Sequence, residues 1–88
     1  MNATVRKSFK KDISKVRDKK LKQRVANVIE NVRNVDSIDD IPNLKKILGY
    51  EFQYRIRIGN YRAGLEIIED DVAFVRFGHR KDFYNFFP

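Results

Sequence analysis

The stretch that decides the fold is YRIRIGNYR, which runs from Tyr54 to Arg62. Its first half alternates aromatic or aliphatic side chains with arginines, which is the pattern of a strand that buries one face. Gly59 and Asn60 follow, and this dipeptide indicates a two-residue hairpin turn because both residues tolerate the positive φ that primed turns require. The stretch therefore predicts a β-hairpin whose register is set by its turn.

Three arginines share the exposed face of this predicted hairpin. A two-residue turn places Arg57 opposite Arg62, and Arg55 opposite Gly64. Like charges that lie directly across a strand pair destabilise it, so the stability of the fold does not explain the arrangement. We interpret this face as a surface that binds a polyanion.

The next turn, in the acidic segment Glu69–Asp71, decides whether a fourth arginine joins them. A two-residue turn would direct Arg76 toward the core, whereas a three-residue turn would direct Ala73, Val75 and Phe77 there. Burial of the three apolar side chains favours the three-residue turn, because a shift of one residue exchanges the two faces of a strand. We therefore expect Arg76 on the same face as the other arginines.

Two more charged residues belong to this predicted face. Arg80 follows the last strand at the same parity, although an ion pair with Asp82 or with the C-terminal carboxylate is an alternative role for it. Glu66 is the only acid on the face. We expect it to pair with a neighbouring arginine, and Arg76 is a candidate partner.

The first 35 residues predict a short edge strand within Asn2–Lys7 and then two antiparallel helices. From Ser8 to Val35, apolar residues recur every three or four positions, as on one face of a helix, with a break near Asp18. Ser8 and Asp18 are candidate N-caps, because their side chains can accept hydrogen bonds from free backbone N–H groups.

The middle of the chain connects the helices to the hairpin. Asp36–Asn43 is acidic and is interpreted as a connector whose Ile38 and Ile41 point inward. Leu44–Leu48 leads to the hairpin without a clear pattern of its own. From Phe52 onward we expect β structure, with Phe52 on the core face. The chain ends in an aromatic tail, in which at least two rings should pack on the helices or on the sheet edge.

Composition limits the class of protein. The 88 residues suffice for one domain, residues 1–88, and 42% hydrophobic residues allow a real core. Nineteen Lys and Arg against 12 acids give a net charge of +7, which favours nucleic acid first, then an acidic protein, then a membrane surface. The chain has no cysteine and one histidine, which excludes disulfides and Cys/His zinc sites. We expect no membrane span, no secretory signal and a cytoplasmic location.

Together these elements predict an α+β domain. Two N-terminal helices pack on one face of a small antiparallel sheet, in the order β-α-α-β-β-β, and an aromatic C-terminal tail follows. The arginines occupy the opposite face.

The second half of the chain resembles the RelE/ParE superfamily of bacterial and archaeal toxins. The resemblance rests on KKILGY, YRIRIGNYR, LEI and GHRKDFY, at Lys45–Tyr50, Tyr54–Arg62, Leu65–Ile67 and Gly78–Tyr84. The element order is also that of the family. The chain is more similar to RelE-type mRNA interferases than to ParE-type gyrase poisons, because it retains the terminal HR…Y segment.

This resemblance implies a toxin of a type II toxin–antitoxin system that enters the ribosomal A site and cuts mRNA. In that reaction the 2′-OH attacks the adjacent phosphate and leaves a 2′,3′-cyclic phosphate and a 5′-OH, without a metal or another cofactor. It also implies a cognate antitoxin that wraps and inhibits the toxin in a hetero-oligomer.

The resemblance also assigns roles to particular residues. Arg55 and Arg57 would bind substrate, whereas Arg62, Arg80 and Tyr84 would act in catalysis. The chemistry agrees with this, because the planar guanidinium group binds phosphate through paired hydrogen bonds. A nucleobase can stack on a tyrosine, although packing in the core is the competing role for Tyr84.

The residues themselves suggest further candidates. Lys45 and Lys46 would contact the RNA backbone or remain solvated turn residues, and Arg76 would contact substrate or pair with Glu66. His79 is a candidate general base, because imidazoles exchange protons near neutral pH, although a lone histidine at a strand end is more often structural.

Departures from the family leave the general base open. The best-known RelE members carry lysines at the positions of Arg55 and Arg57, and a guanidinium group, with a pKa above about 12, is a poor proton acceptor. Leu48 stands where a lysine often precedes the glycine, and Asn43 stands near the glutamate base of a sister branch. His79 and Tyr84 remain as candidate bases, and we expect slow turnover, with a degenerate or inactive member of the family as the alternative. A ParE-like gyrase inhibitor and a non-catalytic basic RNA-binding module are the alternatives.

Overall fold

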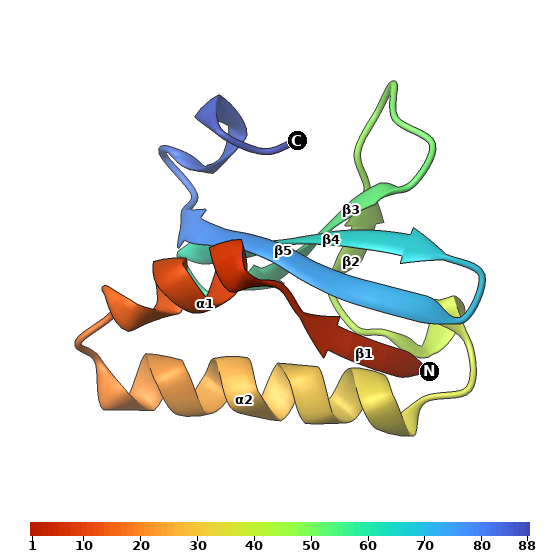
Figure 1. The fold of residues 1–88 in the computed structure, drawn as a ribbon, viewed down its shortest axis with the longest axis horizontal. Helices are drawn as coiled ribbons and strands as arrows, with labels where there is room; N and C mark the ends of the chain where they lie inside the picture. Colours follow the sequence, from red (N-terminus) through yellow and green to blue (C-terminus); the bar gives the residue numbers. More distant parts are fainter.

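A five-stranded mixed sheet runs through the molecule, with two helices on one side and the C-terminal tail on the other (Figure 1). This computed structural model describes residues 1–88. The strands lie in the order β1-β5-β4-β3-β2, with bounds β1 Asn2–Val5, β2 Leu44–Lys46, β3 Gln53–Ile58, β4 Tyr61–Ile68 and β5 Asp71–His79. The helices are α1 (Lys7–Ser14) and α2 (Lys19–Asn34), and two 3-10 turns are η1 (Ile38–Asp40) and η2 (Phe83–Asn85). None of the helices is long and apolar enough to cross a membrane.

The predicted α+β class is confirmed, and the sheet differs from the prediction in two details. The edge strand β1 pairs in parallel with β5, so the sheet is mixed rather than purely antiparallel. The second difference is β2, a three-residue strand that pairs with β3 at the other edge. Three residues are too few to show the alternation by which a strand is recognised in a sequence.

The predicted register of the central hairpin is confirmed. Arg57 pairs with Arg62 and Arg55 pairs with Gly64. Gly59, the first residue of the turn, has a φ of 58°, whereas Asn60 does not have a positive φ. A positive φ at the first turn position alone is the pattern of a type II′ turn, for which glycine is preferred there.

The prediction of a three-residue turn between β4 and β5 is wrong. Ile68 pairs with Asp71, which leaves a turn of two residues. Val72 and Phe74 therefore face the core, whereas Ala73 and Val75 are only half-buried.

A β-bulge at Val75 restores the predicted pairing farther along the two strands. Leu65 pairs with Phe74, whereas its neighbour Gly64 pairs with Arg76, which leaves Val75 without a partner. The extra residue reverses the alternation of faces once. Arg76 consequently lies on the face opposite the core, as expected, although by a different route.

The helix ends match one of the two predicted caps. The Asp18 carboxylate accepts hydrogen bonds from two backbone N–H groups in the first turn of α2, at 2.9 and 3.2 Å. The prediction for Ser8 is wrong, because α1 begins at Lys7 and Arg6 holds the N-cap position without a side-chain hydrogen bond. The Ser8 hydroxyl instead donates to the carbonyl of Val75 on β5.

The core lies between the helices and the sheet. The helices contribute the buried side chains of Phe9, Leu21, Val25 and Val32. Ile41 of the connector is buried and Ile38 packs against the core, as predicted. The placement of Phe52 in the core is wrong, because it precedes β3 in a projecting loop and remains 38% exposed. That loop joins β2 to β3 and stands clear of the sheet (Figure 1).

Candidate nucleic-acid interface

Two rows of residues cross the sheet on the face that points away from the core. One row crosses β2, β3, β4 and β5 and consists of Lys45, Arg55, Gly64 and Arg76. The other crosses β3, β4 and β5 and consists of Arg57, Arg62 and Gly78. We call the five cationic residues of these rows the basic face: Lys45, Arg55, Arg57, Arg62 and Arg76. Each row contains one glycine, so the cations surround two positions that have no side chain.

The aromatic tail covers those two glycines. A Cβ atom on Gly64 would lie 2.8 Å from the ring of Phe87, and one on Gly78 would lie 2.5 Å from the ring of Phe86. Both distances are too short for real contacts, so only glycine permits the two rings to lie against the strands. Phe83 and Phe87 are buried. The prediction that tail rings pack is therefore correct, but they pack on the basic face rather than on the helices or the sheet edge.

Arg76 is held by α1 and by the tail. Its Nε and Nη2 atoms donate to the two carboxylate oxygens of Asp12, at 2.7 and 3.2 Å. The Phe86 ring centroid lies 4.3 Å from the guanidinium carbon, a cation–π contact. Glu66 pairs with Arg6 at 2.9 Å, so the alternative that paired it with Arg76 is wrong.

Asp12 also bonds to the sheet directly. Its Oδ2 atom accepts a hydrogen bond from the Phe77 backbone N–H at 2.9 Å. Burial raises the pKa of Asp12, but the hydrogen bonds from Arg76 and Phe77, with the nearby positive charges, outweigh burial and lower the pKa below its usual value. The carboxylate is therefore ionised wherever the fold is intact near neutral pH.

The other four cations of the basic face have no carboxylate partner. Arg62 Nη1 donates to the carbonyl oxygens of Gly59 and Tyr61, at 3.1 and 2.9 Å. Arg55 Nη1 donates to the carbonyl oxygen of Asn43 at 2.8 Å. Arg57 and Lys45 are exposed, and none of the four takes part in an ion pair. Backbone carbonyls thus orient two guanidinium groups without neutralising them.

Two of the predicted catalytic residues, Arg80 and Tyr84, are exposed in the segment that follows β5. Arg80 lies in the turn after β5, where its backbone N–H bonds to the Asn60 carbonyl at 2.8 Å, and its side chain pairs neither with Asp82 nor with the C-terminus. Tyr84, on η2, is 56% exposed and touches Phe83 edge to face. This exposure contradicts the alternative that the Tyr84 ring packs in the core.

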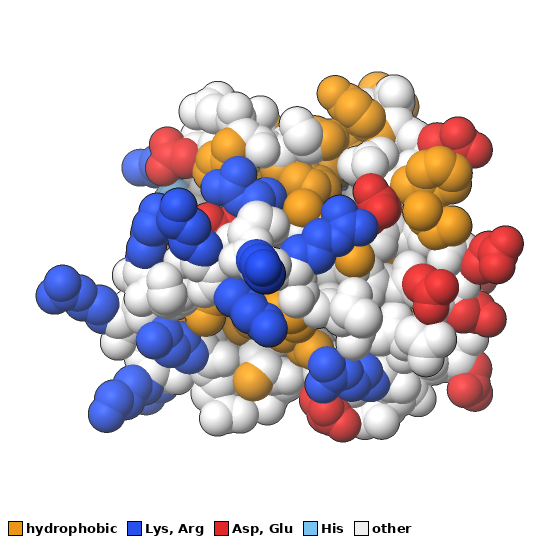
Figure 2. Space-filling model, in the orientation of Figure 1, with side chains coloured by type: hydrophobic (Ala, Val, Ile, Leu, Met, Phe, Trp, Pro, Cys, Tyr) orange, Lys and Arg blue, Asp and Glu red, His pale blue; other side chains and the backbone are white.

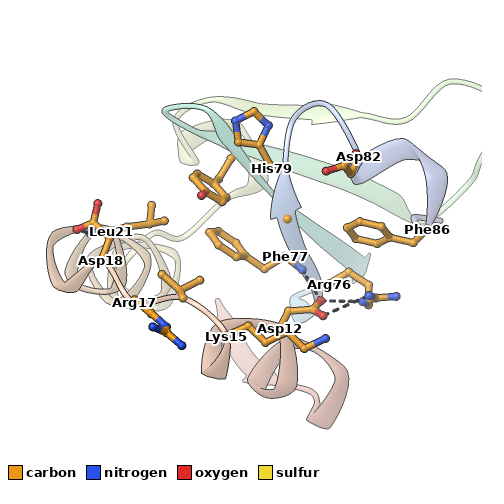
Figure 3. A pocket seen from close by; sticks show the side chains of 13 residues that line it. Asp12, Lys15, Arg17, Asp18, Leu21, Arg76, Phe77, His79, Asp82 and Phe86 are labelled. Carbon is orange, nitrogen blue, oxygen red and sulfur yellow. Dashed lines mark hydrogen bonds and ion pairs between the residues drawn. The ribbon is translucent and has the colours of Figure 1, made fainter.

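Two other predicted site residues lie away from the basic face. Lys46 pairs with Tyr54 in the sheet, which directs its side chain to the opposite face from Lys45. His79 pairs with Tyr61, and the two rings meet edge to face at 5.2 Å. Figure 3 shows the imidazole directed away from the Arg76–Asp12 pair. Neither side chain joins the group that surrounds the two glycines.

The sequence did not reveal the role of Asp12, and the packing expected for the tail rings did not place Phe86 and Phe87 on the basic face. A glycine inside a strand often marks the close approach of another group, and the two strand glycines are such a signal for the rings. Asp12 has no comparable signal, because its contact joins residues that are 64 positions apart.

Charge is distributed unevenly over the molecule. Figure 2 shows Lys and Arg toward the end where α1 meets α2, and Asp and Glu at the opposite end, near the β4–β5 turn. No three His, Cys, Asp or Glu side chains come together as a metal ion would need. The arrangement can therefore attract a polyanion to one end and orient it on the basic face.

Comparisons with known proteins agree with one another. The family model described as ParE toxin of type II toxin-antitoxin system, parDE, matches residues 4–84. Toxin RelE3 of Methanocaldococcus jannaschii is 40% identical over 89 residues, and the match covers all of both chains. A chain of the RelB–RelE antitoxin-toxin complex from Methanococcus jannaschii superposes with a TM-score of 0.80 at 39% identity, covering 96% of this chain and 98% of that one.

More distant structures share the fold alone. The toxin-antitoxin complex RelBE2 of Mycobacterium tuberculosis gives a TM-score of 0.72 at 17% identity, covering 90% of this chain and 96% of that one. The RelE–RelB complex of Pyrococcus horikoshii gives 0.72 at 16% identity, covering 90% and 93%. With the family model and the full-length relative, these findings establish that the chain belongs to the RelE/ParE superfamily of toxins from type II toxin–antitoxin systems.

Proposed function

We propose that this toxin is a RelE-type mRNA interferase, a metal-independent endoribonuclease that cuts mRNA in the A site of the cytoplasmic ribosome. The observation that carries the proposal is the basic face, where Arg57 lies directly across from Arg62 and neither has a carboxylate partner. Such a pair is unfavourable in the free protein. A bound phosphate removes the repulsion and accepts hydrogen bonds from both groups.

The arginines would act mainly by stabilising charge. Attack of the 2′-OH on the adjacent phosphate places an additional negative charge on the phosphoryl oxygens in the transition state, and preorganised donors lower the barrier most. Arg62 suits this role, because backbone carbonyls fix its Nη1 atom while Nε and Nη2 have no hydrogen bond within the chain. Arg55, Arg57 and Lys45 would hold the neighbouring phosphates, and Arg80 would approach from the turn beyond β5.

Proton transfer would depend on the tail. His79 lies on the other side of β5 from the arginines, which makes Tyr84 the better candidate. Its hydroxyl is a weak base at neutral pH, so the proposal implies slow turnover that rests on orientation and charge.

Expression of two variants tests the proposal. Arg62→Ala and Arg80→Ala should each remove growth arrest and slow the appearance of new 5′ ends on a translated mRNA by about 100-fold or more, the usual loss for one charge-stabilising donor. Lys46→Ala is the matched control, because Lys46 points to the other face, and it should arrest growth normally. Growth arrest that survives both arginine substitutions would overturn the nuclease proposal.

The second candidate is a ParE-like toxin that inhibits gyrase by binding. Two observations favour it: the family model matched is that of ParE toxins, and the basic face contains no good proton acceptor. Growth arrest with broken DNA and intact mRNA would establish this candidate in place of the nuclease.

We also infer that a cognate antitoxin binds the chain in a hetero-oligomer. A groove of about 300 Å³ between α1 and α2 supports this inference. Its apolar lining includes Phe9, Ile13 and Val25, and Lys10 and Lys22 also line it. That combination fits an acidic amphipathic segment. An acidic protein encoded beside this chain should copurify with it and relieve growth arrest, and failure of both would contradict the inference.

A further inference from the structure

A cavity of about 480 Å³ opens beside β5, between the connection of α1 to α2 and the C-terminal tail (Figure 3). Its volume lies within the range of about 300–1,000 Å³ that is typical of small-molecule sites. None of the roles assigned above uses this cavity as a whole.

The apolar lining of the cavity is largely aromatic. Tyr61 and Phe77 stack with their rings parallel, at an interplanar angle of 2° and a centroid distance of 5.3 Å. His79 meets Tyr61 edge to face, and Phe86 lines the side toward the tail. Phe77 is buried, so the half-buried rings of Tyr61 and Phe86 are the surfaces on which a nucleobase would stack.

The polar groups of the lining fall into two sets. Asp12, Asp18 and Arg76 already have hydrogen-bond partners within the fold and are therefore occupied. The side chains of Lys15, Arg17 and Asp82 make no hydrogen bond or ion pair. His79 accepts one hydrogen bond at Nδ1 from the Lys81 N–H, which leaves its Nε2 atom without a partner. Free donors and one free carboxylate thus border an apolar, aromatic interior.

The cavity is continuous with the basic face. Arg76 belongs to both, and Gly78, which lines the cavity, pairs directly with Arg62. Paired residues on adjacent strands lie about 5 Å apart. Phe86 covers Gly78 on the basic face, so a nucleotide whose phosphate is held by Arg62 would reach the cavity past this ring.

We propose that this cavity is a nucleobase subsite that takes one base next to the scissile phosphate and prefers a base with an exocyclic amino group. The preference follows from Asp82, because an ionised carboxylate only accepts hydrogen bonds. Adenine, cytosine and guanine offer an amino group, whereas uracil does not. Lys15 and Arg17, which also line the cavity, are the free donors available to ring nitrogen or carbonyl acceptors. The proposal rests on the proposed function, because it assumes that the basic face binds RNA.

Binding of four short RNAs tests the subsite directly. The probes are the 2′-O-methyl trinucleotides UUU, UAU, UCU and UGU, in which the attacking hydroxyl is blocked. Amide NMR shifts should change at Gly78, His79 and Asp82 with the three amino-bearing probes, which should bind about tenfold more tightly than UUU. Asp82→Asn should bring all four affinities within about twofold, since an amide both donates and accepts. Asp70→Asn, in the β4–β5 turn, is the matched control and should keep the preference.

The outcomes separate the subsite from the nuclease. Base-dependent binding in the cavity by a chain that produces no new mRNA ends would support the subsite and contradict the nuclease. Shifts confined to the strands of the basic face, with equal affinity for all four probes, would overturn the subsite and leave the nuclease standing. Binding of none of the probes, or an unchanged preference in Asp82→Asn, would also overturn it.

Discussion

Asp12 connects three parts of the molecule through one carboxylate. Both of its oxygens accept hydrogen bonds from the Arg76 guanidinium group, and Oδ2 also accepts one from the Phe77 N–H on β5. These bonds attach α1 to the sheet. The Phe77 N–H would otherwise lack a partner beside a helix, and an unpaired backbone donor in a part-buried position is costly. The residue is therefore structural, and it also fixes one cation of the basic face.

The first prediction concerns the pH dependence of this contact. Because the folded-state pKa of Asp12 is lowered, its contribution to stability is present above the unfolded-state pKa, near 4, and disappears as the pH falls through the lower folded-state value. Asp12→Asn should lower the free energy of unfolding at pH 7 by about 1–3 kcal/mol. Urea unfolding at pH 7 and below pH 3 measures the difference.

The difference between Asp12→Asn and the native chain should shrink as the pH falls toward the lowered pKa of Asp12, since the native carboxyl then becomes protonated. Asp70→Asn, which changes an exposed carboxylate in a turn, serves as the control and should show little difference at either pH. An equal loss for Asp12→Asn at both pH values would show that the carboxylate charge does not contribute.

At the scale of secondary-structure elements, the C-terminal tail packs on two glycines of the sheet. Phe86 and Phe87 occupy the positions that side chains at Gly78 and Gly64 would fill. The tail therefore belongs to the fold rather than to a frayed end, and it divides the basic face between Arg76 and the arginines of β3 and β4. The same bulge that keeps Phe74 in the core places Arg76 beneath Phe86.

A double-mutant cycle tests this packing. Gly64→Ala should destabilise the native chain by about 1–3 kcal/mol, because its methyl group meets the Phe87 ring. In a Phe87→Ala background the same substitution should cost much less, since the obstacle is gone. Thermal or urea unfolding of the four proteins measures the coupling. Additive losses would show that the ring does not lie on Gly64 in solution.

At the scale of the whole molecule, the two sheet faces divide the charged side chains. Lys45 and Lys46 are neighbours in sequence but point to opposite faces, because successive residues of a strand alternate. Only Lys45 lies in a row with Arg55 and Arg76. Binding of a polyanion should therefore distinguish the two lysines, although composition alone treats them as equal.

Salt dependence provides the measurement. The logarithm of the association constant for single-stranded RNA falls with the logarithm of the salt concentration by about 0.7 per neutralised phosphate. Lys45→Gln should reduce this slope by about 0.7, whereas Lys46→Gln should leave it unchanged. Equal slopes for both variants would place the RNA elsewhere than on the basic face.

Several features of the fold and of the candidate site follow from local patterns. The central hairpin, its register, the cross-strand pair of Arg57 and Arg62 and the Asp18 cap all depend on residues that lie close together in the sequence. The α+β class and the element order follow from the periodicity of helix and strand. The resemblance to the toxin superfamily rested on the same hairpin and on the segment that ends at Tyr84, and the comparisons confirm it.

What the sequence by itself determined is thus the edge strand, the helix pair and the hairpins in their order, and the presence of arginines on one face, but not the short strand β2. Only the tertiary structure decided the two-residue turn with its bulge, the parallel pairing of β1, the separation of His79 and Lys46 from the arginines, and the contacts of Asp12 and the tail. The reason is physical. Hydrophobic periodicity specifies which side chains are buried, but a bulge, a ring over a glycine or an ion pair between a helix and a strand is selected by packing between segments that are distant in the chain.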